Sequence, residues 1–186
     1  SKSVIDRFHV VRLVMDAMQH LRVSLRWKAI EEENTAIKQA KENKEKYCPH
    51  IYSNGDTLKE LLARSRYLLY KYEEDWTLNQ SKRADILFEK YPTLKLVYDL
   101  TLSFRNIYKN FSRNDALHKF NEWKEKTIAL KIDEFNTVVH SLENHLDNIL
   151  NFFDNRSTNA NAESFNSKIK GFRANLRGVT DVKFFI

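Results

Sequence analysis

Two short segments near the ends of the chain combine residue types that could do chemistry. In the later one, residues 157–170 (STNANAESFNSKIK), a carboxylate, several amides and two lysines gather where a polar stretch leads into a helix. If Asn161 caps that helix, Glu163, Asn166 and Lys170 follow at spacings of three and four and share one face. A carboxylate, an amide and an ammonium group would then point toward one ligand.

The earlier segment is residues 4–10 (VIDRFHV), where short apolar residues lead to Asp6 and then to an aromatic helix start. Both segments also have a purely structural interpretation. Asp6 could be a helix N-cap followed by a partly buried His9. Glu163 could complement the positive end of a helix dipole, with a solvated basic face behind it. Pattern alone favours the structural interpretation.

The composition predicts which elements must position these segments. The 186 residues include only three Gly and two Pro, whereas β-sandwiches, barrels and βα repeats need many turn residues. Apolar residues recur at three- and four-residue steps along most of the sequence. We therefore expect an all-α fold, a helical bundle.

Local signals divide this bundle into helices. Asp56 or Thr57 and then Thr77 are expected caps, and Asn54-Gly55 is an expected turn. Pro92 and then Ser112 or Asn114 are expected helix starts. The polar half of the first helix should project from the body. The expected helices cover about residues 8–46, 57–71, 77–87, 92–109, 112–128, 132–153 and 162–176.

The tryptophans, the histidines and Cys48 are the other residues of types that could form a binding site. Trp27, Trp76 and Trp123 stand among Leu and Phe at helical spacing, so the core is expected to hold them rather than a base-stacking surface. Leu96 and Ile128 are expected on buried stripes as well. The histidines lack the spacing of zinc ligands, although His50 stands close to Cys48.

Charge and cysteine usage limit the cellular setting. Lys and Arg exceed Asp and Glu by six, and the pI of about 9.3 fits a polyanionic partner, as it does many intracellular proteins. Cys48 has no partner for an internal disulfide, and no apolar stretch reaches the ~18 residues of a membrane span. No signal peptide is visible. We expect a cytoplasmic protein without a membrane partner, cut from a longer chain at both ends.

The two segments resemble motifs of DDE-class transposases of bacterial insertion sequences. Residues 6–10 resemble the second-acid motif, in which an acid ends a strand just before an aromatic-His helix start. Residues 158–170 resemble the third-acid motif, which reads approximately Thr-Asn, an acid shortly after, an Asn and then Lys-x-Lys. A long helical insertion separates the two acids in this group, as here. The chain departs from the pattern at Ala160 and Val179, where the family often has Gly and an aromatic residue.

The resemblance implies a metal-dependent nuclease. Asp6 and Glu163 would be the second and third ligands of two Mg²⁺ or Mn²⁺ ions in an RNase H-like domain. The first Asp would lie upstream of residue 1, so the fragment alone would be inactive. The implied activity is DNA strand cleavage and strand transfer during transposition, by a homo-oligomer on DNA. The implied DNA-binding residues are Asn166, Lys168, Lys170, Arg173 and Arg177.

The resemblance also implies a division of the chain. Residues 1–30 and 154–186 would belong to the catalytic core, and residues 31–153 would form the helical insertion domain. The alternative is a non-enzymatic helical scaffold or a nucleic-acid- or protein-binding module, with residues 31–46 as a docking arm. Only the transposase hypothesis requires the carboxylates of Asp6 and Glu163 to be near neighbours.

Overall fold

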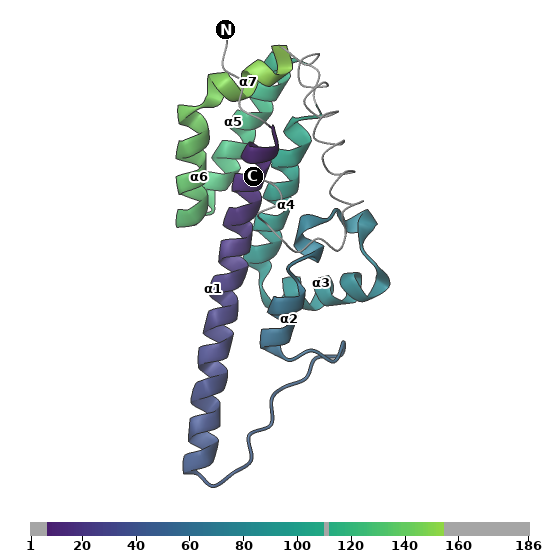
Figure 1. Cartoon of the computed structure of the whole chain (residues 1–186), viewed down its shortest axis with the longest axis vertical. Coiled ribbons are helices and arrows are strands. Elements are labelled where there is room, and N and C mark those ends of the chain that lie inside the picture. The colour runs from purple at the N-terminus through teal and green to yellow at the C-terminus, as the bar shows by residue number, and fades with distance from the viewer. Residues whose placement is uncertain (1–6, 110–111, 155–186) are drawn as a thin grey trace, which may run out of the picture.

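The computed structural model describes residues 7–109 and 112–154, and this part of the chain is all-α, without a strand (Figure 1). The all-α prediction is therefore confirmed. The elements are α1 (Arg7–Glu42), α2 (Leu58–Arg64), η1 (Leu68–Tyr70), η2 (Glu73–Asp75), α3 (Leu78–Lys90), α4 (Pro92–Ile107), α5 (Arg113–Ala129), α6 (Asp133–Asn144) and α7 (Leu146–Asp154).

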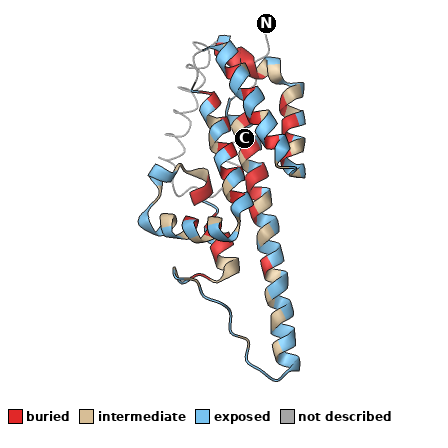
Figure 2. Cartoon of the chain, turned by 180° about the vertical axis from the view of Figure 1, so that it is seen from behind, coloured by how far each residue is buried: buried red, intermediate tan, exposed pale blue. Residues whose placement is uncertain are grey.

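Helix α1 is the axis of the fold. Its first half turns Val10, Val14 and Met18 into the core, and α2, α4, α6 and α7 all contact it. Its second half extends beyond the body of the bundle, and its side chains other than Ala29 are exposed or half-buried, as the polar sequence predicts (Figures 1 and 2). The helix ends at Glu42, four residues earlier than expected.

Local capping signals located most helix starts correctly. Thr57 and Thr77 each form a capping box with the residue three positions later, Glu60 and Gln80. Pro92 opens α4, where its missing N–H costs nothing. Ser112 caps α5 by accepting a hydrogen bond from the backbone N–H of Asp115.

The prediction that the second helix reaches residue 71 was wrong, since α2 ends at Arg64. The following backbone carbonyls accept hydrogen bonds from side chains of other elements, so they do not depend on helical N–H donors. The chain can therefore bend through η1. The donor–acceptor pairs are Gln19 Nε2 to Arg66 O (3.1 Å), Trp76 Nε1 to Leu68 O (2.8 Å), Arg105 Nη1 to Tyr70 O (3.0 Å) and Tyr98 OH to Lys71 O (2.8 Å).

The helix expected over residues 132–153 is two helices, because His145 leaves the helical conformation at φ −119° and ψ 13°. A straight helix would bury one stripe only. After the break, α7 crosses the end of the bundle (Figure 1), where residues 149–153 are all buried. Five consecutive buried residues thus explain the change of direction.

The core confirms two of the three tryptophan predictions. Trp123 is buried and donates its indole N–H to Leu100 O at 3.0 Å, and Trp76 packs against Tyr98. Trp27 was predicted wrongly, because 62% of its surface is exposed on the projecting part of α1. Leu96 and Ile128 are exposed as well, since each lies outside the buried stripe of its helix.

Asp56 holds the loop after α1 against α2 and α3. Its buried carboxylate accepts hydrogen bonds from Arg83 Nε at 2.7 Å, from Asn54 Nδ2 at 2.8 Å and from Arg64 Nη1. Burial alone would raise the pKa of Asp56, but the hydrogen bonds from Arg83 and Arg64 hold it below its ordinary value. The folded state therefore favours the charged carboxylate.

Replacing this carboxylate by an amide should destabilise the fold. Asp56→Asn leaves Arg83, which is mostly buried, without its counter-charge, and we expect a loss of about 2–3 kcal/mol in the free energy of unfolding. This is less than for a fully buried pair because Arg64 is half exposed. Urea denaturation measures the loss. The control Asp99→Asn removes an exposed ion pair with Lys95 and should change stability by less than about 1 kcal/mol. Equal effects of the two variants would contradict this role of Asp56.

The lowered pKa of Asp56 also predicts a specific acid sensitivity. Its folded pKa lies below the unfolded value of about 3.9, so its contribution is complete above that value and is lost as the pH falls through the folded pKa. The free energy of unfolding should therefore fall more between pH 5 and pH 2 in the wild type than in Asp56→Asn, measured by denaturation at each pH. Parallel curves for the two proteins would refute the prediction.

Candidate functional site

The predicted site residues lie outside the part of the chain that the structure describes. This holds for both acids, Asp6 and Glu163, and for the basic segment after Glu163. The predicted DNA-binding residues concerned are Asn166, Lys168, Lys170, Arg173 and Arg177. The structure does place Arg7, the residue after Asp6, and Asp154, nine residues before Glu163.

These two stretches meet at one end of the bundle. Helix α1 begins at Arg7, the residue after Asp6, and α7 ends at Asp154. The guanidinium carbon of Arg7 lies 5.8 Å from the centre of the Tyr108 ring. That ring in turn contacts Phe152 and Phe153 of α7, with ring centres 5.3 and 5.8 Å apart. Helices α1 and α7 are also in direct contact (Figure 1).

Aromatic packing builds this end of the molecule. Tyr108 follows α4 and is buried. Its neighbour Phe104 lies 4.7 Å from Trp123 of α5, measured between ring centres. Together with Phe152 and Phe153, these residues form a group that we call the aromatic cluster. Rings of this size exclude water and fix the angle between the helices that carry them, so the start of α1 and the end of α7 are held in place.

Arg113 fastens the end of α7 from the polar side. It donates from Nη1 to Asp154 Oδ2 at 3.0 Å and to Asn151 Oδ1 at 3.1 Å, and from Nη2 to Asp147 Oδ1 at 2.9 Å. Sequence reasoning missed this residue. A signal was available, because a cation in the first turn of a helix opposes the helix dipole and so needs a compensating partner.

The motif residues after Asp6 face outward in the described part of the chain. Phe8 is 55% exposed, and its ring meets that of His9 edge to face at 5.8 Å. His9 is also exposed, whereas the purely structural interpretation of this segment would have it partly buried. The residues beside Asp6 therefore lie at the surface of the bundle end.

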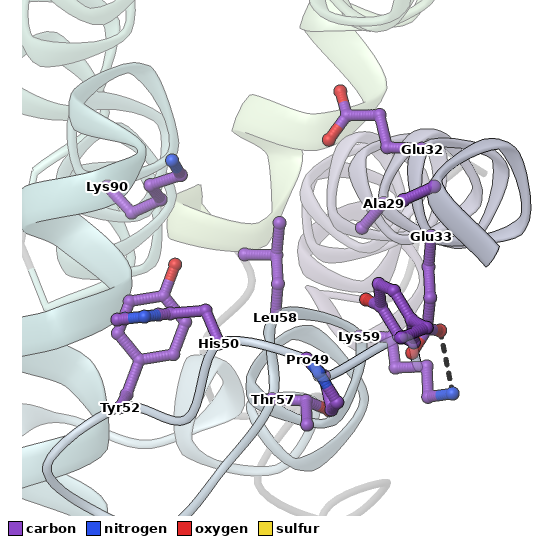
Figure 3. Close-up of a pocket in the computed structure, with 12 residues that line it drawn as sticks. Ala29, Glu32, Glu33, Pro49, His50, Tyr52, Thr57, Leu58, Lys59 and Lys90 are labelled. Carbon is purple, nitrogen blue, oxygen red and sulfur yellow. Dashed lines mark ion pairs between the residues drawn. The ribbon is translucent and has the colours of Figure 1, made fainter. Parts of the chain in front are cut away.

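A groove of about 340 Å³ lies elsewhere, between the projecting half of α1 and the loop that returns from it (Figure 3). Its walls include Ala29, Leu58 and Tyr52, whose ring meets His50 edge to face. A hydrogen-bonded ion pair of 2.7 Å joins Glu33 to Lys59 and raises the pKa of the lysine. Glu32 and Lys90 also line the groove, so its walls combine apolar and charged side chains.

The described residues offer neither a metal-binding cluster nor a membrane-spanning helix. Within residues 7–109 and 112–154, no three His, Cys, Asp or Glu side chains are grouped so that they could hold a metal ion. Over the same ranges, every helix is too short or too polar to cross a membrane. The single cysteine, Cys48, is exposed.

Comparison with known proteins assigns the chain to a family. No curated protein and no solved structure matches it. A family model described as Transposase, DDE_Tnp_ISL3, matches residues 1–186. The match includes both acid segments and all the helices between them, so this chain belongs to the DDE_Tnp_ISL3 family of transposases.

Proposed function

We propose that this chain supplies two of the three carboxylates, Asp6 and Glu163, with which an RNase H-like DDE transposase cuts DNA strands and joins them to a target. Membership of a transposase family makes DNA the substrate. The observation that supports the finer proposal is the meeting of the start of α1 with the end of α7 at the aromatic cluster.

This meeting shortens the path between the two acids. Asp6 is bonded to Arg7, so their Cα atoms are about 3.8 Å apart. Glu163 follows Asp154 by nine residues, a span of at most about 30 Å when fully extended. The helices between the acids return the chain to the end of the bundle where α1 began. The long interval in sequence is thus compatible with neighbouring carboxylates.

The donor types fit hard divalent cations, since Mg²⁺ and Mn²⁺ prefer carboxylate oxygens. Two such ions, when bound, activate the attacking oxygen and stabilise the leaving one in phosphodiester cleavage. In this proposal Asp6 and Glu163 hold them together with an Asp from an earlier part of the protein. A fragment without that Asp would be inactive.

The basic residues after Glu163 are proposed to hold the DNA. Lys168, Lys170, Arg173 and Arg177 would neutralise phosphates beside the cleaved bond, and Asn166 would donate a hydrogen bond. Phosphate contacts of this kind position the backbone without reading its sequence. We further propose that the transposase works on DNA as a homo-oligomer in the cytoplasm.

Removing either carboxylate should abolish cleavage without preventing DNA binding. Loss of groups that only support metal ligands commonly costs 10–100-fold, so Asp6→Asn and Glu163→Gln should each slow cleavage more than about 100-fold. The assay is Mg²⁺- or Mn²⁺-dependent cleavage of a transposon-end duplex by the intact transposase, with binding measured by gel shift. Glu125→Gln, at an exposed acid of α5, is the control. Undiminished cleavage by either variant would remove that acid from the site, and activity indifferent to both would favour a helical binding module.

The lysines should contribute to affinity through the release of counterions. Lys168→Ala combined with Lys170→Ala should weaken duplex binding and reduce the slope of log affinity against log salt concentration by about 1.8, or 0.9 for each phosphate contact. Fluorescence anisotropy over a salt series measures the slope. Lys82→Ala combined with Lys126→Ala, at two exposed lysines of α3 and α5, is the matched control. If the slope stays the same in the first variant, these lysines do not contact phosphates.

A further inference from the structure

From Val23 onward, α1 carries an exposed apolar stripe that the bundle does not use. Trp27 is 62% exposed, Ile37 42% and Val23 38%, and Ile30 is half-buried. The core-facing residues of the same helix, such as Val14 and Leu25, lie on its opposite side at 100° per residue. The stripe therefore points away from the body of the protein.

The spacing of the stripe is that of a two-stranded coiled coil. In heptad notation Trp27 and Asn34 occupy a positions, and Val23, Ile30 and Ile37 occupy d positions. We call these five residues the α1 seam. An Asn at an a position costs stability but fixes the register and favours two strands, because it pairs with its own copy across the interface.

The residues beside the α1 seam have complementary charges. Arg26 is at a g position and Glu31 at the e position five residues later, the two sites that face each other across a parallel pair. One heptad on, Glu33 and Lys38 have the same relation with the signs reversed. Arg26, Glu31 and Lys38 are exposed and make no ion pair with another described residue. Glu33 bonds to Lys59 through Oε2.

We propose that the α1 seam binds a second copy of this chain, with the two α1 helices parallel and in register. The second half of α1 stands clear of the body, so another helix can approach it (Figure 2). DNA is a poor partner for this surface, because residues 26–42 hold four cations and four anions and DNA-binding faces are strongly basic. The inference does not rest on the cleavage chemistry proposed above.

Sedimentation equilibrium of the intact protein without DNA tests the interface. The wild type should dimerise with a Kd below about 100 µM, and Trp27→Glu combined with Ile37→Glu should raise the Kd at least about tenfold, because two like charges would be buried in each seam. Leu96→Glu is the control, since it places the same charge at a 50% exposed apolar residue of α4. Circular dichroism checks that all three proteins are folded. A monomeric wild type, or a dimer unaffected by the seam variant, would overturn the proposal.

Two further variants test the parallel register. With Cys48→Ser in the background, Asn34→Cys should form a disulfide between copies on mild oxidation, because a positions face each other across the pair. Gln39→Cys, at an exposed position on the side of α1 opposite the α1 seam, should not. Arg26→Glu should weaken the dimer, and adding Glu31→Arg should restore it. A dimer without the cross-link at position 34, or without this charge rescue, would rule out the parallel arrangement.

Discussion

The apolar face on the first half of α1 is the constraint on which the rest of the described structure depends. Helices α2, α4, α6 and α7 all pack against this one helix, so its burial decides where each returning segment can lie. Two polar residues on the same stretch reinforce the packing. Gln19 and Arg22 donate to backbone carbonyls at the end of α2 and beyond it, Arg66 O at 3.1 Å and Leu62 O at 2.9 Å. The end of α7 is brought beside Arg7 as a result.

Helix starts could be predicted from the sequence because capping is local. The side chains of Thr57, Thr77 and Ser112 bond within three or four residues of themselves, so a short window contains all the relevant groups. The early end of α2 could not be predicted in this way. It depends on donors such as Arg105, 35 residues away from the carbonyl that it serves. The break at His145 likewise follows from what α7 buries.

The acids of the proposed site could be located through motif resemblance, whereas the residues that shape their surroundings could not. Tyr108 carries no signal in the sequence, and the position of Arg113 indicates only that it needs a partner; their contacts appear when α1, α5 and α7 are seen together. Trp27 shows a related difficulty. Helix α1 has apolar residues on two sides, and periodicity alone assigns both to the core. Only the position of the body distinguishes the packed side from the exposed one.

The uninterrupted length of α1 has a mechanical consequence. Its 36 residues correspond to a rod of about 54 Å, whose first half is packed in the bundle and whose second half extends beyond it. Such a rod is a lever. A tilt of about 10° of the packed half would move the free tip, about 27 Å beyond it, by about 5 Å. Rearrangements among the aromatic rings that tilt α1 would therefore be transmitted to the tip, and restraint of the tip would in turn limit movement of the packed half.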